Sequence, residues 1–190
     1  YFIEPPSEGW IYADSLIEDK REIKRSILNG DYESVVGKIV VSKDDVVYIP
    51  SGTLHALTRG SLVYEIQQST DITYRFFDYN RLDNDGKLRD LHLDDAIETL
   101  NTENRVKSSA FPKDTLISEQ PYTMVRKTLE NVYHNTTDVA VAITVSKGSM
   151  CVDGHSILTG MSILVLPNET ISISQAAEEV VIATPKLYFK

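Results

Sequence analysis

The stretch that organises this chain is Val46-Val47-Tyr48-Ile49-Pro50-Ser51-Gly52-Thr53-Leu54-His55-Ala56-Leu57. It opens with four β-branched or aromatic residues, the composition of a buried strand. Pro50 and Gly52 then end that strand, because proline has no amide hydrogen to donate and glycine permits a sharp turn. His55 stands at the start of the next apolar segment. The pattern therefore predicts an imidazole that is fixed where one strand turns into another.

A second turn, at residues 58–61, leads into a further predicted strand over residues 62–68. Its alternation puts Val63, Glu65 and Gln67 on one face and the even-numbered residues on the other. We expect Gln67 and Gln68 to line or pack the wall of the site. A carboxylate and an amide on one wall, with a histidine at the preceding turn, predict a polar site inside an apolar barrel.

Several segments in this order carry a resemblance to a known family. They are residues 48–57, Glu65-Ile66-Gln67-Gln68-Ser69 and Asp71-Ile72-Thr73-Tyr74-Arg75. Together they closely resemble type I phosphomannose isomerase (mannose-6-phosphate isomerase). The segments Asp78-Tyr79-Asn80-Arg81 and Leu91-His92-Leu93-Asp94-Asp95-Ala96-Ile97 look like the bacterial branch of that family. The similarity is strong over residues 1–100 and looser afterwards.

The resemblance implies a fold, a reaction and a cofactor. The fold is mainly β, with two cupin jelly-roll barrels, the first incomplete, and a few short helices. The reaction is the interconversion of mannose 6-phosphate and fructose 6-phosphate by a zinc-dependent aldose–ketose isomerase. His55 matches the metal-binding histidine of the family and Arg75 its active-site arginine. A glutamate and a Gln-x-His pair would precede Tyr1, so we expect a C-terminal portion whose other ligands of the one zinc ion and main base lie upstream. The activity of the isolated chain stays open.

The chemistry of the residues alone leaves alternatives beside each of these roles. A lone histidine such as His55 is often a hydrogen-bonded core residue instead of a ligand. The guanidinium of Arg75 can stabilise an enediolate, hold a phosphate, or simply pair with Asp71 or Asp78. Asp71 and Glu65 are candidate proton-transfer groups, or acceptors that orient His55 or Arg75.

The other basic side chains are less distinctive. His92, His134 and His155 lie at a helix entry or in hairpins and are predicted at the surface. Arg126 and Lys127 could serve an anionic ligand, but nothing in the pattern singles them out. Two other functions remain open: a sugar-binding or regulatory cupin module without catalysis, and a different metal cupin such as an iron oxygenase.

Composition excludes several classes of protein. The net charge of -9 over 190 residues argues against a nucleic-acid partner, which would need a basic face, but is compatible with a small phosphorylated sugar. The single cysteine, Cys151, rules out an intrachain disulfide and fits a reducing, cytoplasmic compartment. No apolar run approaches the length needed to span a membrane.

The periodicity divides the chain into two predicted domains. The resemblance implies that residues 1–104 form the C-terminal part of the catalytic cupin domain. The residue pattern there predicts a helical insertion at about 14–29, capped by Asp14 or Ser15 and stopped by Asn29-Gly30. Residues 94–100 predict a short helix. The polar segment 105–118 would be an irregular connection. From residue 119 to 190, two-residue alternation predicts strands at 122–130, 139–145, 149–152, 155–158, 161–166, 170–174 and 179–184, a second jelly roll without its own metal site.

Overall fold

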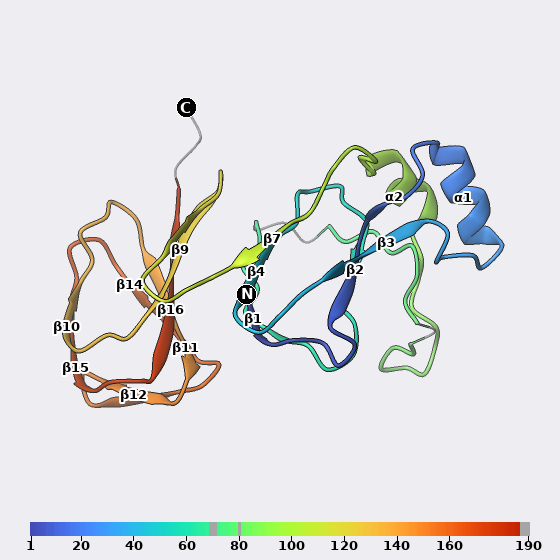
Figure 1. Ribbon diagram of the computed structural model, residues 1–190. Coiled ribbons are helices and arrows are strands. Elements are labelled where there is room, and N and C mark those ends of the chain that lie inside the picture. Colours follow the sequence, from blue (N-terminus) through green and yellow to red (C-terminus); the bar gives the residue numbers. More distant parts are fainter. Residues whose placement is uncertain (69–71, 80, 187–190) are drawn as a thin grey trace. The chain divides into compact units, whose positions relative to one another are not determined.

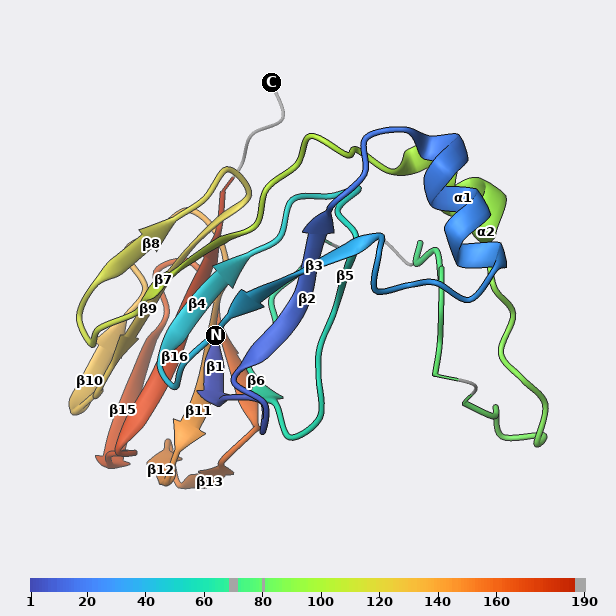
Figure 2. The ribbon, with the colours of Figure 1, turned by 45° about the vertical axis from the view of Figure 1, so that its right-hand side comes forward.

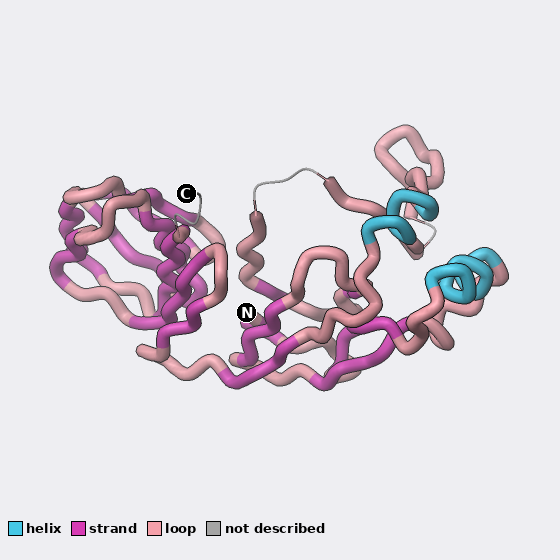
Figure 3. The backbone as a smooth tube through the Cα atoms, turned by 90° about the horizontal axis from the view of Figure 1, so that it is seen from above, coloured by secondary structure: helices cyan, strands magenta, loops and turns pink. Residues whose placement is uncertain are grey.

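The computed structural model describes residues 1–68, 72–79 and 81–186. The chain divides into two compact units, Tyr1–Ser109 and Ala110–Lys190. Each unit contains more strand than helix, and the two described helices belong to the first unit (Figure 3). The prediction of a mainly β fold is confirmed. No helix in the described ranges is long and apolar enough to cross a membrane.

The first unit contains three small sheets and two helices among the described residues. In chain order the elements are β1 (Phe2–Glu4), β2 (Trp10–Ser15), α1 (Lys20–Leu28), β3 (Val36–Val40), β4 (Asp45–Tyr48), β5 (His55–Ala56), β6 (Leu62–Val63), α2 (Leu93–Thr99) and β7 (Lys107–Ala110). The sheets pair β1 with β6, place β2 between β3 and β5 (Figure 2), and pair β4 with β7.

Two apolar clusters hold this unit together. In the first cluster, the buried side chains of Phe2, Ile11 and Val41 pack together with partly buried apolar residues of β3, β4 and β6. The second cluster joins the two helices, where Ile23 and Ile27 of α1 are buried and residues of α2 pack on the same group (Figure 1). The spacing of Ile23 and Ile27 puts both on one face of α1, so the helix buries that face and leaves its charged face in solvent.

The predicted start of the first helix is wrong. Asp19 is the N-cap, and its carboxylate accepts a hydrogen bond of 2.8 Å from the Arg21 amide. Ser15 lies instead at the end of β2, paired with Val36, and its hydroxyl donates to the carbonyl of Ile17. Serine and aspartate are good caps wherever the backbone turns, so local preference could not rank Ser15 against Asp19.

The second unit is built from nine described strands, and seven of them follow the predicted alternation with small changes at their ends. In chain order the nine are β8 (Leu116–Ser118), β9 (Tyr122–Lys127), β10 (Asn131–His134), β11 (Val141–Lys147), β12 (Ser149–Val152), β13 (His155–Leu158), β14 (Ser162–Val165), β15 (Thr170–Gln175) and β16 (Glu179–Pro185). The hairpin between β12 and β13 turns at Asp153 and Gly154, which both have positive φ, as a tight two-residue turn requires.

These strands form a sandwich of two antiparallel sheets. One has the order β10-β15-β12-β13 and the other β14-β11-β16-β9-β8. One apolar core takes side chains from both sheets, and its members without exposed surface are Val141, Ile143, Val145, Val165 and Val180. This is the layered arrangement expected of a jelly roll.

Three expectations about secondary structure fail. The segment predicted as an irregular connection contains β7 and β8, and β10 lies outside every predicted strand. The strand predicted over residues 62–68 ends at Val63. A strand needs a neighbour for its hydrogen bonds. Among the described residues β6 pairs with β1 as far as Val63, and hydrogen bonds between Tyr64 and Tyr1 continue that pairing.

Candidate functional site

The turn before His55 is held by contacts on several sides. Thr53 is buried, and its hydroxyl donates to the carbonyl of Pro50 at 2.6 Å. The side-chain amide of Asn104 donates to the carbonyl of Ser51 and to the hydroxyl of Thr53, both at 2.9 Å. These bonds give the Pro50–Thr53 turn one conformation, so the residues that follow it leave in a fixed direction.

His55 is placed at the start of β5, as the sequence predicts. It pairs with Ala13 of β2, and its side chain is exposed. Its Nδ1 lies 2.9 Å from the carbonyl oxygen of Thr53. Because a carbonyl oxygen only accepts, Nδ1 carries the proton in this arrangement and Nε2 keeps its lone pair. A backbone acceptor on one ring nitrogen is the support that metal-binding histidines commonly have.

Arg75 and His92 lie at the two ends of a long loop and are hydrogen-bonded to each other through their main chains. The amide of His92 donates to the carbonyl of Arg75 at 3.0 Å. The Arg75 side chain is partly buried, and its guanidinium makes no hydrogen bond or ion pair with any residue of the described ranges. It is therefore a cation without a counter-charge in the part of the chain that can be described.

The short helix α2 connects the two candidate residues. At its N-terminal end, His92 is the N-cap and holds the carbonyl of Arg75. Just beyond its C-terminal end, Asn101 donates from its amide to the carbonyl of Gly52 at 2.8 Å, in the turn that leads to His55. A seven-residue helix is about 10 Å long. We call α2 a strut because it separates the backbone of Arg75, bound at one end of the helix, from the turn before His55, bound at the other.

A buried carboxylate, that of Asp78, joins residues within the loop between Arg75 and His92. Asp78 is 5% exposed and accepts hydrogen bonds from Arg81 and Arg89, with Nη2 of Arg89 at 2.7 Å from Oδ1. The hydrogen bonds from Arg89, and those from Arg81, hold the pKa of this carboxyl below its ordinary value, although burial acts in the opposite direction. Asp78 therefore pairs with two other arginines and not with Arg75, which removes one of the structural roles that the sequence left open for Arg75.

The structure does not bring the predicted carboxylate of Glu65 into hydrogen-bond or ion-pair contact with His55 or Arg75 among the described residues. Glu65 is exposed and lies beyond the end of β6, so the predicted wall of alternating side chains does not form there. Gln67 and Gln68 are exposed too, whereas they were expected to line or pack the site. Asp71 lies outside the described residues. No hydrogen bond or ion pair joins the side chains of His55, Glu65 and Arg75 within the described ranges.

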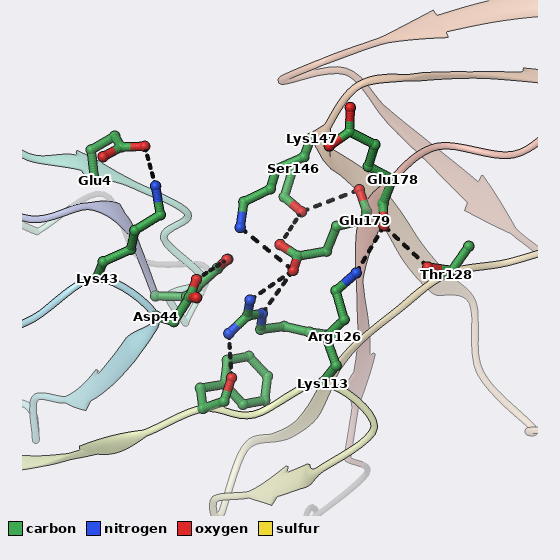
Figure 4. A network of polar contacts seen from close by, with 12 residues as sticks. Glu4, Lys43, Asp44, Lys113, Arg126, Thr128, Ser146, Lys147, Glu178 and Glu179 are labelled. Atoms are coloured by element: carbon green, nitrogen blue, oxygen red, sulfur yellow. Dashed lines mark hydrogen bonds and ion pairs between the residues drawn. The ribbon is translucent and has the colours of Figure 1, made fainter.

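The second unit contains a polar network that the sequence did not single out (Figure 4). Arg126 and Glu179 are 3% and 0% exposed, and Nη2 of Arg126 lies 2.7 Å from Oε2 of Glu179. Ser146 donates to the other carboxylate oxygen at 2.7 Å, and Arg126 also donates to the carbonyl of Phe111. The expectation that Arg126 could serve an anionic ligand is wrong, because its guanidinium is buried against Glu179. Charged residues at strand ends give no hint in sequence of which partners they will meet.

Two further features of the first unit were also missed. The pairing of Asp78 with Arg81 has i,i+3 spacing, which a search for opposite charges near Arg75 could have found. His92 was predicted at the surface, but its Nδ1 is buried and is the one buried side-chain nitrogen or oxygen among the described residues without a hydrogen-bond partner. Its place directly before an acidic helix start was a usable indication of an N-cap.

The described residues supply His55 as a candidate metal ligand but not a whole metal site. Within residues 1–68, 72–79 and 81–186, no group of three or more His, Cys, Asp or Glu side chains could hold a metal ion. The orientation of the His55 ring fits one ligand of zinc.

Comparison with known proteins identifies relatives over about half of the chain. Over 100 residues, or 53% of the chain, it is 39% identical to the probable mannose-6-phosphate isomerase GmuF of Bacillus subtilis. Over 83 residues, or 44% of the chain, it is 41% identical to the mannose-6-phosphate isomerase of Streptococcus mutans. About half of the chain is thus homologous to mannose-6-phosphate isomerases. The matched residues make up 32% and 26% of these two isomerases. No family model matches the chain.

Solved structures extend the similarity to the whole chain. The mannose 6-phosphate isomerase from Bacillus subtilis aligns with a TM-score of 0.72 and 25% identity, over 97% of this chain and 63% of that protein. A putative mannosephosphate isomerase from Archaeoglobus fulgidus aligns with a TM-score of 0.63 and 14% identity, over 98% of this chain and 60% of that protein, which shows the shared fold. The chain thus spans less than two thirds of each of these isomerases.

Proposed function

We propose that the chain is part of a zinc-dependent aldose–ketose isomerase that interconverts mannose 6-phosphate and fructose 6-phosphate. The observation that carries the proposal is that backbone hydrogen bonds join the two ends of α2 to the carbonyl of Arg75 and to the turn before His55. The His55 Nε2 keeps its lone pair, and the Arg75 guanidinium has no partner among the described residues. The similarity to mannose-6-phosphate isomerases supplies the reaction class. A cytoplasmic location is part of the proposal, since the single cysteine cannot form an intrachain disulfide.

In this proposal His55 is one ligand of the zinc ion. The bond from its Nδ1 to the carbonyl of Thr53 fixes both the tautomer and the direction of Nε2. A bound zinc ion would act as a Lewis acid toward the sugar carbonyl. At least part of the remaining ligand set has to come from outside the described residues, because these contain no group of three or more His, Cys, Asp or Glu side chains that could hold a metal ion.

Arg75 would stabilise negative charge on the substrate. Moving a hydrogen between C1 and C2 of a sugar passes through an enediolate, whose oxygens need a nearby positive group. A guanidinium without a counter-charge among the described residues suits this task, and its forked donors suit a phosphate equally well. Asp71 and Glu65 stay candidates for moving or orienting protons.

The test uses the intact protein with two matched histidine substitutions. His55→Asn is compared with His155→Asn, which changes an exposed histidine on β13 in the same way. Zinc content is measured by elemental analysis, and turnover by the conversion of mannose 6-phosphate. We expect His55→Asn to lose zinc and activity and His155→Asn to keep both. Arg75→Lys should keep zinc and lose about a hundredfold or more in kcat.

Other outcomes would select the competing functions. Bound iron with oxygen uptake would overturn the isomerase in favour of an oxygenase. Binding of the sugar phosphate by the unsubstituted protein without turnover would favour a non-catalytic module. Retention of zinc and full activity in His55→Asn would remove His55 from the metal site.

A further inference from the structure

His92 joins the segment that carries Arg75 to the N-terminal end of α2. Its amide donates to the carbonyl of Arg75 at 3.0 Å, while its own carbonyl accepts the first bond of the helix, from Ala96, at 2.8 Å. The backbone at Arg75 is therefore tied to the helix through this one residue. Any change in how the His92 backbone sits is transmitted to Arg75 directly.

The imidazole makes a second connection to the same segment. Its ring packs on Tyr74, the residue before Arg75, with 6.1 Å between the ring centroids and 59° between the ring planes. Tilted ring pairs at this separation attract each other. The residue therefore holds the segment twice, by its main chain at Arg75 and by its ring at Tyr74.

The same imidazole is a poor choice for local stability. His92 stands at the N-cap of α2 but makes no side-chain hydrogen bond to the helix, and its buried Nδ1 has no partner among the described residues. Asparagine, aspartate or serine would normally supply the missing cap bond. A buried nitrogen without a partner costs stability, and such local violations concentrate at functional sites.

We propose that His92 is a positioning residue for Arg75, and that the packing of its ring on Tyr74 is what holds the guanidinium in its working direction. This proposal rests on the proposed isomerase function. The ring, and not the hydrogen-bonding capacity of Nδ1, carries the role, because Nδ1 is buried and unpaired within the described ranges.

The experiment compares two substitutions that separate capping from ring packing. In the intact zinc-loaded protein, His92→Asn supplies a better cap but no ring, and His92→Phe keeps a ring but no Nδ1. We expect His92→Asn to raise Tm by about 2 °C and to lower kcat roughly tenfold to a hundredfold. His92→Phe should stay within about twofold of the unsubstituted kcat, and His155→Asn is the matched control at an exposed site.

Two further measurements distinguish positioning from a general structural effect. In an Arg75→Lys background, His92→Asn should cause no further loss in kcat, because both changes remove the same interaction. The NMR order parameter of the Arg75 Nε–H bond should fall in His92→Asn and stay unchanged in His92→Phe, and this reading does not need turnover. Absence of isomerase activity in the unsubstituted protein would refute the proposed function. The order-parameter measurement would still test whether His92 positions Arg75. Full kcat and an unchanged order parameter in His92→Asn, or a loss in His92→Phe equal to that in His92→Asn, would overturn the proposal.

Discussion

Replacing Gly52 by alanine tests how tightly α2 holds the turn that leads to His55. Gly52 has a φ of +77°, and a Cβ added there would lie 2.8 Å from the backbone carbonyl oxygen of Thr99, at the end of α2. An L-residue in this left-handed conformation costs about 1 kcal/mol. The close contact adds about 1–3 kcal/mol, because the neighbouring atom belongs to the backbone and cannot rotate away. We expect Gly52→Ala to lower the free energy of unfolding by about 2–4 kcal/mol.

Gly30 provides the matched control for the conformational part of this cost. Its φ is +76°, but a Cβ there would meet nothing within 4 Å, so Gly30→Ala should cost only about 1 kcal/mol. Urea unfolding can be followed by the fluorescence of Trp10, the only tryptophan, which lies on β2 in the same unit. If the two variants lose the same stability, the contact between the turn and α2 does not constrain the turn, and the reasoning about the strut fails.

Two further substitutions address the buried charges. The carboxylate of Asp78 has a lowered pKa, chiefly through Arg89, so it stabilises the fold fully above about pH 4 and loses that effect as the pH falls through the lowered value. Asp78→Asn should therefore reduce stability at pH 7, and the difference in urea midpoint from the unsubstituted protein should shrink below about pH 4; a difference independent of pH would contradict this account. Glu179→Leu should cost about 3–5 kcal/mol in thermal or urea unfolding, because it removes the buried carboxylate that pairs with the buried guanidinium of Arg126. The exposed neighbour Glu178→Leu should stay within about 0.5 kcal/mol, and equal losses in the two variants would show that the buried pair is not what matters.

The features that could be predicted from sequence are those that short-range chemistry decides. Pro50 and Gly52 end one strand and open the turn before His55 whatever surrounds them. The turn at Asp153 and Gly154 likewise depends on residues that accept positive φ, which the structure shows at both positions. Alternation of apolar residues then places most strands of the second unit close to their observed ends.

The features that could not be predicted depend on partners distant in sequence. The pairing of β6 with β1 continues in bonds between Tyr64 and Tyr1, which are 63 residues apart, and local composition does not identify such a partner. Arg126 and Glu179 are 53 residues apart, and only the ordering of β9 and β16 in one sheet brings them together. The contact between the His92 ring and Tyr74 has the same origin, because the chain must complete the loop between Arg75 and His92 before the two rings can meet.

The turn before His55 and the backbone of Arg75 are both bound to α2, so α1, the helix that packs on α2, also affects the candidate site. A helix of seven residues is not stable by itself in water, so α2 must take its stability from packing. Part of that packing comes from α1, whose Ile23 and Ile27 share an apolar cluster with α2. Lys24 of α1 also pairs with Asp94 in the first turn of α2, and a second lysine of α1 donates to a carbonyl near the end of α2. Although α1 carries no candidate site residue, it holds the strut that sets the separation between the His55 turn and the backbone of Arg75.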